Sequence, residues 1–217
     1  MISANTTTRK APARQEKQTD VWKLTMTAML SILSFILMFF EFSLPIIPSF
    51  VKMDLSDLPA LLGAFAMGPV SGAAVCLVKN LLHLFITSTG GVGELSNFLL
   101  GACFVFPAGL VYHKWKNKKS AFFGAFAGAL LMGIVSIASN YYIVYPFFYH
   151  IMPEETILAA YQLILPQMES MLECLIIFNA PFTFVKGLFC LTITMAIYKP
   201  LSPFLKGAYR KYGPVRQ

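Results

Sequence analysis

The chain has 217 residues, of which 57% are hydrophobic and only 12% are charged, and its formal net charge is +7. Soluble domains carry about 25% charged residues, so this composition, with a mean hydropathy of +0.66, excludes a disordered chain, a secreted disulfide scaffold and an ordinary cytosolic enzyme. It indicates an integral membrane protein, and the positive charge is evidence of nucleic-acid binding only if its placement supports that.

The apolar runs begin directly after a polar, basic stretch. The first run is longer than the roughly 7–15-residue core of a cleaved signal peptide and has no A-x-A-like site, so we expect a retained span. The sequence thus predicts a cytoplasmic tail over residues 1–20, a membrane domain over 21–200 and a basic cytoplasmic tail over 201–217. At about 20 residues per span, the predicted membrane helices are residues 21–44, 58–67, 70–87, 95–112, 121–149 and 171–198.

The second of these runs is short. At about 1.5 Å per residue it reaches about 15 Å, half the hydrocarbon thickness, and the turn signal Gly68-Pro69 follows it. Fusing residues 58–87 into one kinked helix would give five spans instead. With six spans, the three clusters that hold 14 of the 17 basic residues (five in 9–23, four in 114–119, five in 199–216) all lie inside. The positive-inside bias therefore selects six spans and reads the net charge as an orientation signal.

The predicted first outer loop, residues 45–57, combines prolines with large apolar side chains. Pro45 and Pro48 discourage a helix. The loop is compatible with resting on lipid headgroups, or with closing as a lid over an apolar ligand. For the lid, the candidate gate residues are Pro45, Phe50 and Asp54.

Polar side chains inside the spans are informative, because a charge at a span centre costs about 2.5–3.5 kcal/mol on insertion scales. Asn179, Thr183 and Lys186 share one helical face at i, i+4 and i+7. No carboxylate occurs at mid-depth in any predicted span. Lys186 is therefore either a structural ion-pair partner or, as we favour, a ligand-binding residue.

Other polar residues in the spans can be read either as ligand-binding or as structural. Asn140 in the fifth run needs a partner, and Tyr142 belongs to a tyrosine group that is also typical of an interfacial aromatic belt. Asn97 opens the fourth run, where it is equally suited to capping the helix. Lys79 and His83 share a face of the third run, and for them we favour a structural role between helices.

Small residues mark places where helices approach closely. Thr27, Ser31 and Ser34 lie at i, i+4 and i+7 in the first run, and Gly124 and Gly128 at i and i+4 in the fifth. In lipid such faces pack internally or dock another membrane subunit. The sequence has no Walker A motif, no catalytic constellation and no metal-ligand pattern. It therefore predicts a binding protein without an energy source of its own.

Four stretches of the chain carry a family resemblance. They read KMDLSDLPALLGAFAMGPVSGAAVCLVKNLLHL (52–84), GELSNFLLGA (93–102), NYY (140–142) and PFTFVKG (181–187). They resemble the riboflavin-specific substrate-binding subunits of energy-coupling factor (ECF) transporters, over about residues 21–200. The resemblance implies an all-α bundle of six transmembrane helices with a short second helix, cytoplasmic termini and a gating first outer loop.

The resemblance also implies a function and a site. The chain would capture riboflavin at the outer face of a bacterial cell membrane and would not be an enzyme. Asn140 and Lys186 would bind the ligand, with Thr183 where the family often has Asn, and Asn97 is a weaker carry-over. We add Asn179 and Tyr142 as ligand-binding candidates, and expect no metal or cofactor besides the transported vitamin.

The partners implied are a membrane scaffold subunit and two cytoplasmic ATPase subunits. The scaffold would contact the first helix around Thr27 and Ser31. No arginine lies in the spans, which argues against flavin phosphates as ligands. The alternatives are a subunit for another vitamin (thiamine, biotin or pantothenate) and, in another class, a membrane scaffold or an intramembrane enzyme.

Overall fold

The computed structural model describes residues 13–43, 47–48, 51–87 and 89–212. Five described helical segments are long and apolar enough to cross a membrane, and a sixth apolar helix is shorter. The five segments are Asp20–Met38, Pro69–Ile86, Val92–Trp115, Lys118–Phe148 and Met171–Tyr198. Their main helices are α1 (Ala13–Met38), α3 (Pro69–His83), α4 (Val92–Trp115), α5 (Lys118–Ser139) and α9 (Ala180–Tyr212). The short one is α2 (Asp57–Met67). These elements confirm the predicted apolar runs, with shifted ends.

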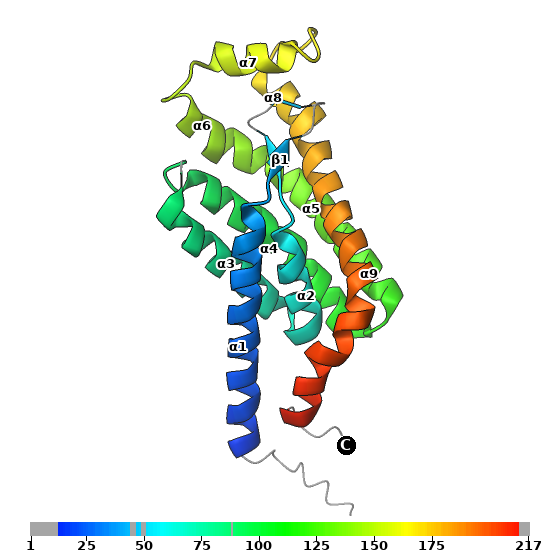
Figure 1. Cartoon of the computed structure of the whole chain (residues 1–217). Helices are drawn as coiled ribbons and strands as arrows, with labels where there is room; N and C mark the ends of the chain where they lie inside the picture. Colours follow the sequence, from blue (N-terminus) through cyan, green and yellow to red (C-terminus); the bar gives the residue numbers. More distant parts are fainter. Residues whose placement is uncertain (1–12, 44–46, 49–50, 88, 213–217) are drawn as a thin grey trace, which may run out of the picture.

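Several short elements join or extend the long helices. They are β1 (Phe42–Ser43), β2 (Lys52–Met53), η1 (Leu84–Ile86), the π-helical turns η2 (Asn140–Val144) and η3 (Leu175–Asn179), α6 (Tyr145–Phe148), α7 (Glu154–Gln162) and α8 (Met171–Cys174). In Figure 1, α1 begins and α9 ends at one end of the bundle, while α6, α7 and α8 lie at the other.

The helix α2 is buried on almost every side. Ten of its eleven residues are buried, and it packs against α1, α3, α4 and α9. Gly68 ends it with φ 117° and ψ 165°, a conformation essentially restricted to glycine. Pro69 then starts α3 at the position where a missing N–H is tolerated. The Gly-Pro turn thus returns the chain at once, so a helix too short to span alone is shielded by its neighbours.

Small residues let α4 and α5 pack closely, as predicted for Gly124 and Gly128. A Cβ atom on Gly124 would lie 2.8 Å from Val111 Cβ, and one on Gly128 would overlap the carbonyl of Phe104. The two helices share the most extensive contact in the bundle. Phe104 and the neighbouring α5 alanines form the centre of the main hydrophobic core.

The predicted docking face of α1 points inward. Ser31 and Ser34 are fully buried, and the Ser31 hydroxyl donates to the Thr27 carbonyl at 2.7 Å. Thr27 is half-buried, with its hydroxyl 4.0 Å from Met67 Sδ on α2. Ser31 is therefore not exposed at the surface of the isolated chain, and the contact of a partner subunit with this part of α1 stays a prediction.

Two elements near the outer loops were not predicted. β1 and β2 pair antiparallel, with Phe42 opposite Met53 and Ser43 opposite Lys52. The amphipathic helix α7 buries Ile157 and Tyr161 against Tyr145, Met171 and Leu175, while its other face is exposed. Both elements lie at the end of the bundle marked by α8 in Figure 1.

Candidate functional site

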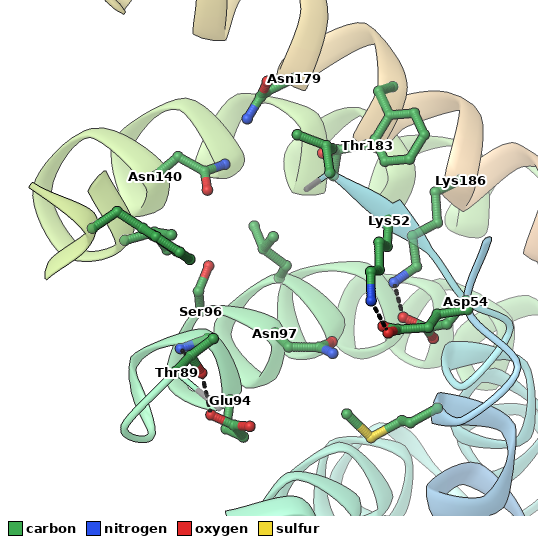
Figure 2. Close-up of a pocket in the computed structure, with 18 of the residues that line it drawn as sticks. Lys52, Asp54, Thr89, Glu94, Ser96, Asn97, Asn140, Asn179, Thr183 and Lys186 are labelled. Atoms are coloured by element: carbon green, nitrogen blue, oxygen red, sulfur yellow. Dashed lines mark hydrogen bonds and ion pairs between the residues drawn. The ribbon is translucent and has the colours of Figure 1, made fainter. Parts of the chain in front are cut away.

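A cavity of about 800 Å³ lies between the β1–β2 hairpin and the facing ends of α4, α5 and α9. Apolar side chains form much of its wall, and polar groups converge on it from several elements (Figure 2). The polar residues lining it are Glu41, Lys52, Asp54, His83, Thr89, Glu94, Ser96, Asn97, Asn140, Asn179, Thr183 and Lys186. An apolar cavity with a few convergent polar groups is the usual form of a small-molecule site.

Five predicted ligand-binding residues come together at this cavity. They are Asn97, Asn140, Asn179, Thr183 and Lys186. Asn97 lies on α4 on one side, while the other four project from η2, η3 and α9 across from it (Figure 2). Helical spacing thus grouped Asn179, Thr183 and Lys186 correctly on one wall, and ligand binding by the five residues stays a prediction.

Two of these residues sit at π-helical turns. Asn140 begins η2 and Asn179 ends η3. Single π turns within α-helices frequently occur at functional sites, because the extra residue re-aims the side chains around it. The Asn140 amide N–H donates to the Ser136 carbonyl at 2.8 Å, which leaves its oxygen free to accept from a ligand.

Asn179 belongs to a ring of hydrogen bonds with two tyrosines. The Tyr161 hydroxyl donates to Asn179 Oδ1 at 2.7 Å and lies 2.7 Å from the Tyr145 hydroxyl. The Asn179 amide N–H donates to the Tyr145 hydroxyl at 3.5 Å. Tyr145 and Tyr161 were missed by the sequence analysis. The i, i+4 pair Ile157 and Tyr161 is the signal that could have revealed the α7 helix.

A second polar group lines the cavity where α3 meets α4. His83 Nδ1 lies 2.7 Å from Glu94 Oε1, and the Thr89 hydroxyl donates to Glu94 Oε2 at 2.9 Å. Glu94 was not among the predicted site residues, and a structural role was expected for His83. The structure shows both a contact between helices and a place at the cavity wall.

Lys186 is paired within the protein, which corrects the expectation that it has no counter-ion. Its ammonium lies 3.0 Å from Asp54 Oδ2 and 3.4 Å from Asp57 Oδ2. These carboxylates precede and begin α2, whose short, buried course brings its N-terminus to the depth of Lys186. Lys79 on α3 lies 2.6 Å from Asp57 Oδ1 and does not line the cavity.

Asp54 lies ahead of α2 and outside the candidate spans. Burial raises the pKa of its carboxyl, but the ammonium groups of Lys186 and Lys79 outweigh that effect. The Ser56 backbone N–H, which donates to Asp54 Oδ1 at 2.7 Å, adds to the stabilisation of the anion. The pKa of Asp54 is therefore well below its ordinary value, and the carboxylate is ionised at neutral pH.

The remaining predicted site residues divide in three ways. Asp54 lines the cavity together with Val51 and Lys52 from the predicted gate loop. Pro45 and Phe50 lie outside the described residues. Tyr142 is 75% exposed and is absent from the cavity wall, so the structure does not place it at the site.

No group of three His, Cys, Asp or Glu side chains within the described ranges is arranged to hold a metal ion. The polar lining consists of amides, hydroxyls, carboxylates, lysines and the imidazole of His83. This set suits an uncharged, polyfunctional organic ligand, whose carbonyls, N–H groups and hydroxyls match amide and carboxylate partners.

Comparison with known proteins gives a consistent result. Residues 22–198 match the model of the family described as ECF transporter, substrate-specific component. Riboflavin transporter RibU of Staphylococcus aureus (strain TCH60) is 32% identical over 185 residues, which cover 85% of this chain and 92% of that protein. Riboflavin transporter FmnP of Bacillus subtilis (strain 168) is 28% identical over 190 residues, covering 86% and 95%.

A solved structure agrees with these sequence relatives. The S component of a bacterial ECF transporter superposes with a TM-score of 0.68 at 31% identity, covering 86% of this chain and 99% of that one. The helical bundle, the family match over most of the chain and the structural likeness lead to one conclusion: the chain belongs to the substrate-specific components of ECF transporters.

Proposed function

We propose that this chain is the riboflavin-binding subunit of an ECF vitamin uptake transporter. The observation that carries the proposal is the amide-and-lysine lining of the cavity, in a chain whose relatives are named riboflavin transporters. A flavin ring is flat and largely apolar, and its pyrimidine edge alternates carbonyl acceptors with an N–H donor. Asparagine offers both roles, and Asn140 and Asn179 converge on one side of the cavity.

The lining suggests an orientation for the vitamin. Asn140, Asn179 and Thr183 would bind the pyrimidine edge, and Lys186 would donate to a ring acceptor. Glu94, already bonded to Thr89, would accept from hydroxyls of the ribityl chain. Carboxylates repel phosphate, so this arrangement favours riboflavin over its phosphorylated forms.

The proposed topology has six spans and cytoplasmic termini. Two observations support it: α1 begins and α9 ends at the same end of the bundle (Figure 1), and the basic clusters gather on that side under a six-span count. The cavity then opens toward the outer face, beside the β1–β2 hairpin as the candidate gate. A membrane scaffold subunit and two ATPase subunits would supply the energy for uptake.

The direct test is binding by the purified protein. Titration into detergent-solubilised protein should quench riboflavin fluorescence with a stoichiometry of one, and protein purified from cells should carry a flavin absorption spectrum. Thiamine, biotin and pantothenate should not compete. Colourless protein that ignores riboflavin but binds one of these vitamins would replace the proposal with the same role for another ligand.

A further inference from the structure

Four buried charges meet at one end of the cavity. Lys186 and Asp54 line it, whereas Asp57 and Lys79 lie behind them. Asp57 joins the two lysines, because its Oδ1 lies 2.6 Å from Lys79 and its Oδ2 lies 3.4 Å from Lys186. Two cations and two anions give this group, the charge cluster, no net charge.

The contacts of Lys79 hold it away from the ligand. It is fully buried, and its ammonium donates to Ser56 Oγ at 2.5 Å as well as to Asp57. The backbone of Ser56 in turn donates to Asp54 Oδ1, so the other oxygen of Asp54 is directed to Lys186. Lys79 and Ser56 thus organise the cluster from the side opposite the cavity.

Charge balance decides where the Lys186 ammonium rests. Attraction between unit charges is strong in a buried, low-dielectric site, and an uncompensated buried charge is costly. With Lys79 present, Asp57 is already neutralised, and Lys186 stays closer to Asp54 at 3.0 Å than to Asp57 at 3.4 Å. Without Lys79, Lys186 would be the sole cation for two carboxylates and would move into the cluster.

We propose that Lys79 is a positioning residue for Lys186, acting through Asp57. Lys79 neutralises Asp57 and thereby keeps the Lys186 ammonium at the cavity wall, where it donates to an acceptor on the ligand. The identity of that ligand rests on the proposed function, whereas the placement of Lys186 is a property of the ligand-free protein.

Three variants separate this role from a merely structural ion pair. Lys79→Met leaves a surplus anion and should raise the Kd for riboflavin at least about tenfold. Asp57→Asn leaves a surplus cation, keeps the Asp54–Lys186 pair, and should raise it at most about threefold. The double variant is neutral again and should return to within about threefold of the unmodified protein. Thr194→Val, a buried change on α9 away from the cavity, is the control.

A second measurement needs no ligand. Reductive methylation with formaldehyde, scored by mass spectrometry of the Lys186 peptide, reports how accessible the Lys186 amine is. Methylation should slow in Lys79→Met and should not slow in Asp57→Asn or the double variant. If Lys79→Met does not fold, slower methylation of Lys186 in the double variant than in the unmodified protein still overturns the inference.

Two results would overturn the inference. One is equal weakening of binding by both single variants, which is what a purely structural ion pair predicts. The other is a slower methylation of Lys186 in the double variant than in the unmodified protein. Failure of the unmodified protein to bind riboflavin would contradict the proposed function alone, because the methylation comparison still tests the position of Lys186.

Discussion

Tyr161 lies behind the cavity wall and yet acts on it through Asn179. Its hydroxyl is the shortest contact of the Asn179 amide, at 2.7 Å. Removing that hydroxyl while keeping the ring leaves a buried amide oxygen without this donor, at a cost of roughly 0.5–1.5 kcal/mol. Tyr161→Phe should therefore weaken riboflavin binding about two- to tenfold.

The matched control for that change is Tyr142→Phe, which removes the same hydroxyl from an exposed ring outside the cavity. Isothermal titration of both variants, with melting temperatures recorded alongside, makes the comparison. Equal affinities in the two variants would show that the Tyr161 hydroxyl does not hold Asn179 in place for the ligand.

Glu94 offers a second test at the residue scale, because the proposed orientation gives it only the ribityl chain. A hydrogen bond to a charged group contributes roughly 1.5–3 kcal/mol. Glu94→Gln should weaken riboflavin binding about ten- to a hundredfold and leave the affinity for lumiflavin, which has the ring but no ribityl chain, within about threefold. Competition titrations measure both ligands in one assay. Loss of both affinities in parallel would place Glu94 at the ring instead.

Among the elements, α2 most affects the site, because its N-terminus carries Asp57 to the charge cluster. Its end depends on Gly68, whose φ of 117° and ψ of 165° strain any other residue. The nearest atom to an added Cβ would be His113 Nε2 at 3.9 Å, so crowding plays no part. Gly68→Ala should cost roughly 1–3 kcal/mol through backbone strain alone.

The expected result for Gly68→Ala is a lower melting temperature without ligand, with riboflavin affinity reduced to a lesser degree. Differential scanning fluorimetry with and without the vitamin reads both. An unchanged melting temperature would mean that α2 and α3 are joined by a more tolerant turn than the structure contains.

The sequence predicted some elements well, for physical reasons. The long helices were predicted because a continuous apolar run can be identified from the local sequence alone, without knowledge of tertiary contacts. The β1–β2 hairpin has strands of two residues, too short for a periodic pattern, and α7 was hidden because only Ile157 and Tyr161 mark its buried face. The pairing of Lys186 was missed because Asp54 is 132 residues away in sequence.

For the whole molecule, the number of crossings determines on which side each tail lies. Six spans would put both tails on the same side, which is the cytoplasm in the proposed topology, whereas five would put them on opposite sides. Cysteines introduced as Thr6→Cys and Gly213→Cys should both react with a membrane-impermeant maleimide only after the cells are permeabilised. Thr156→Cys on the exposed face of α7 should react in intact cells. Labelling of one tail from outside would reject the six-span topology.

The charge cluster has a consequence for how the protein is made. Lys79 and Asp57 are 22 residues apart and can neutralise each other while the first helices enter the bilayer. Asp54 has its lysine partner only when nearly the whole chain has been synthesised, because Lys186 belongs to the last helix. Insertion of α9 therefore completes the neutrality of the charge cluster. A nascent chain that stops before α9 holds a carboxylate without its lysine partner, which is costly inside the membrane.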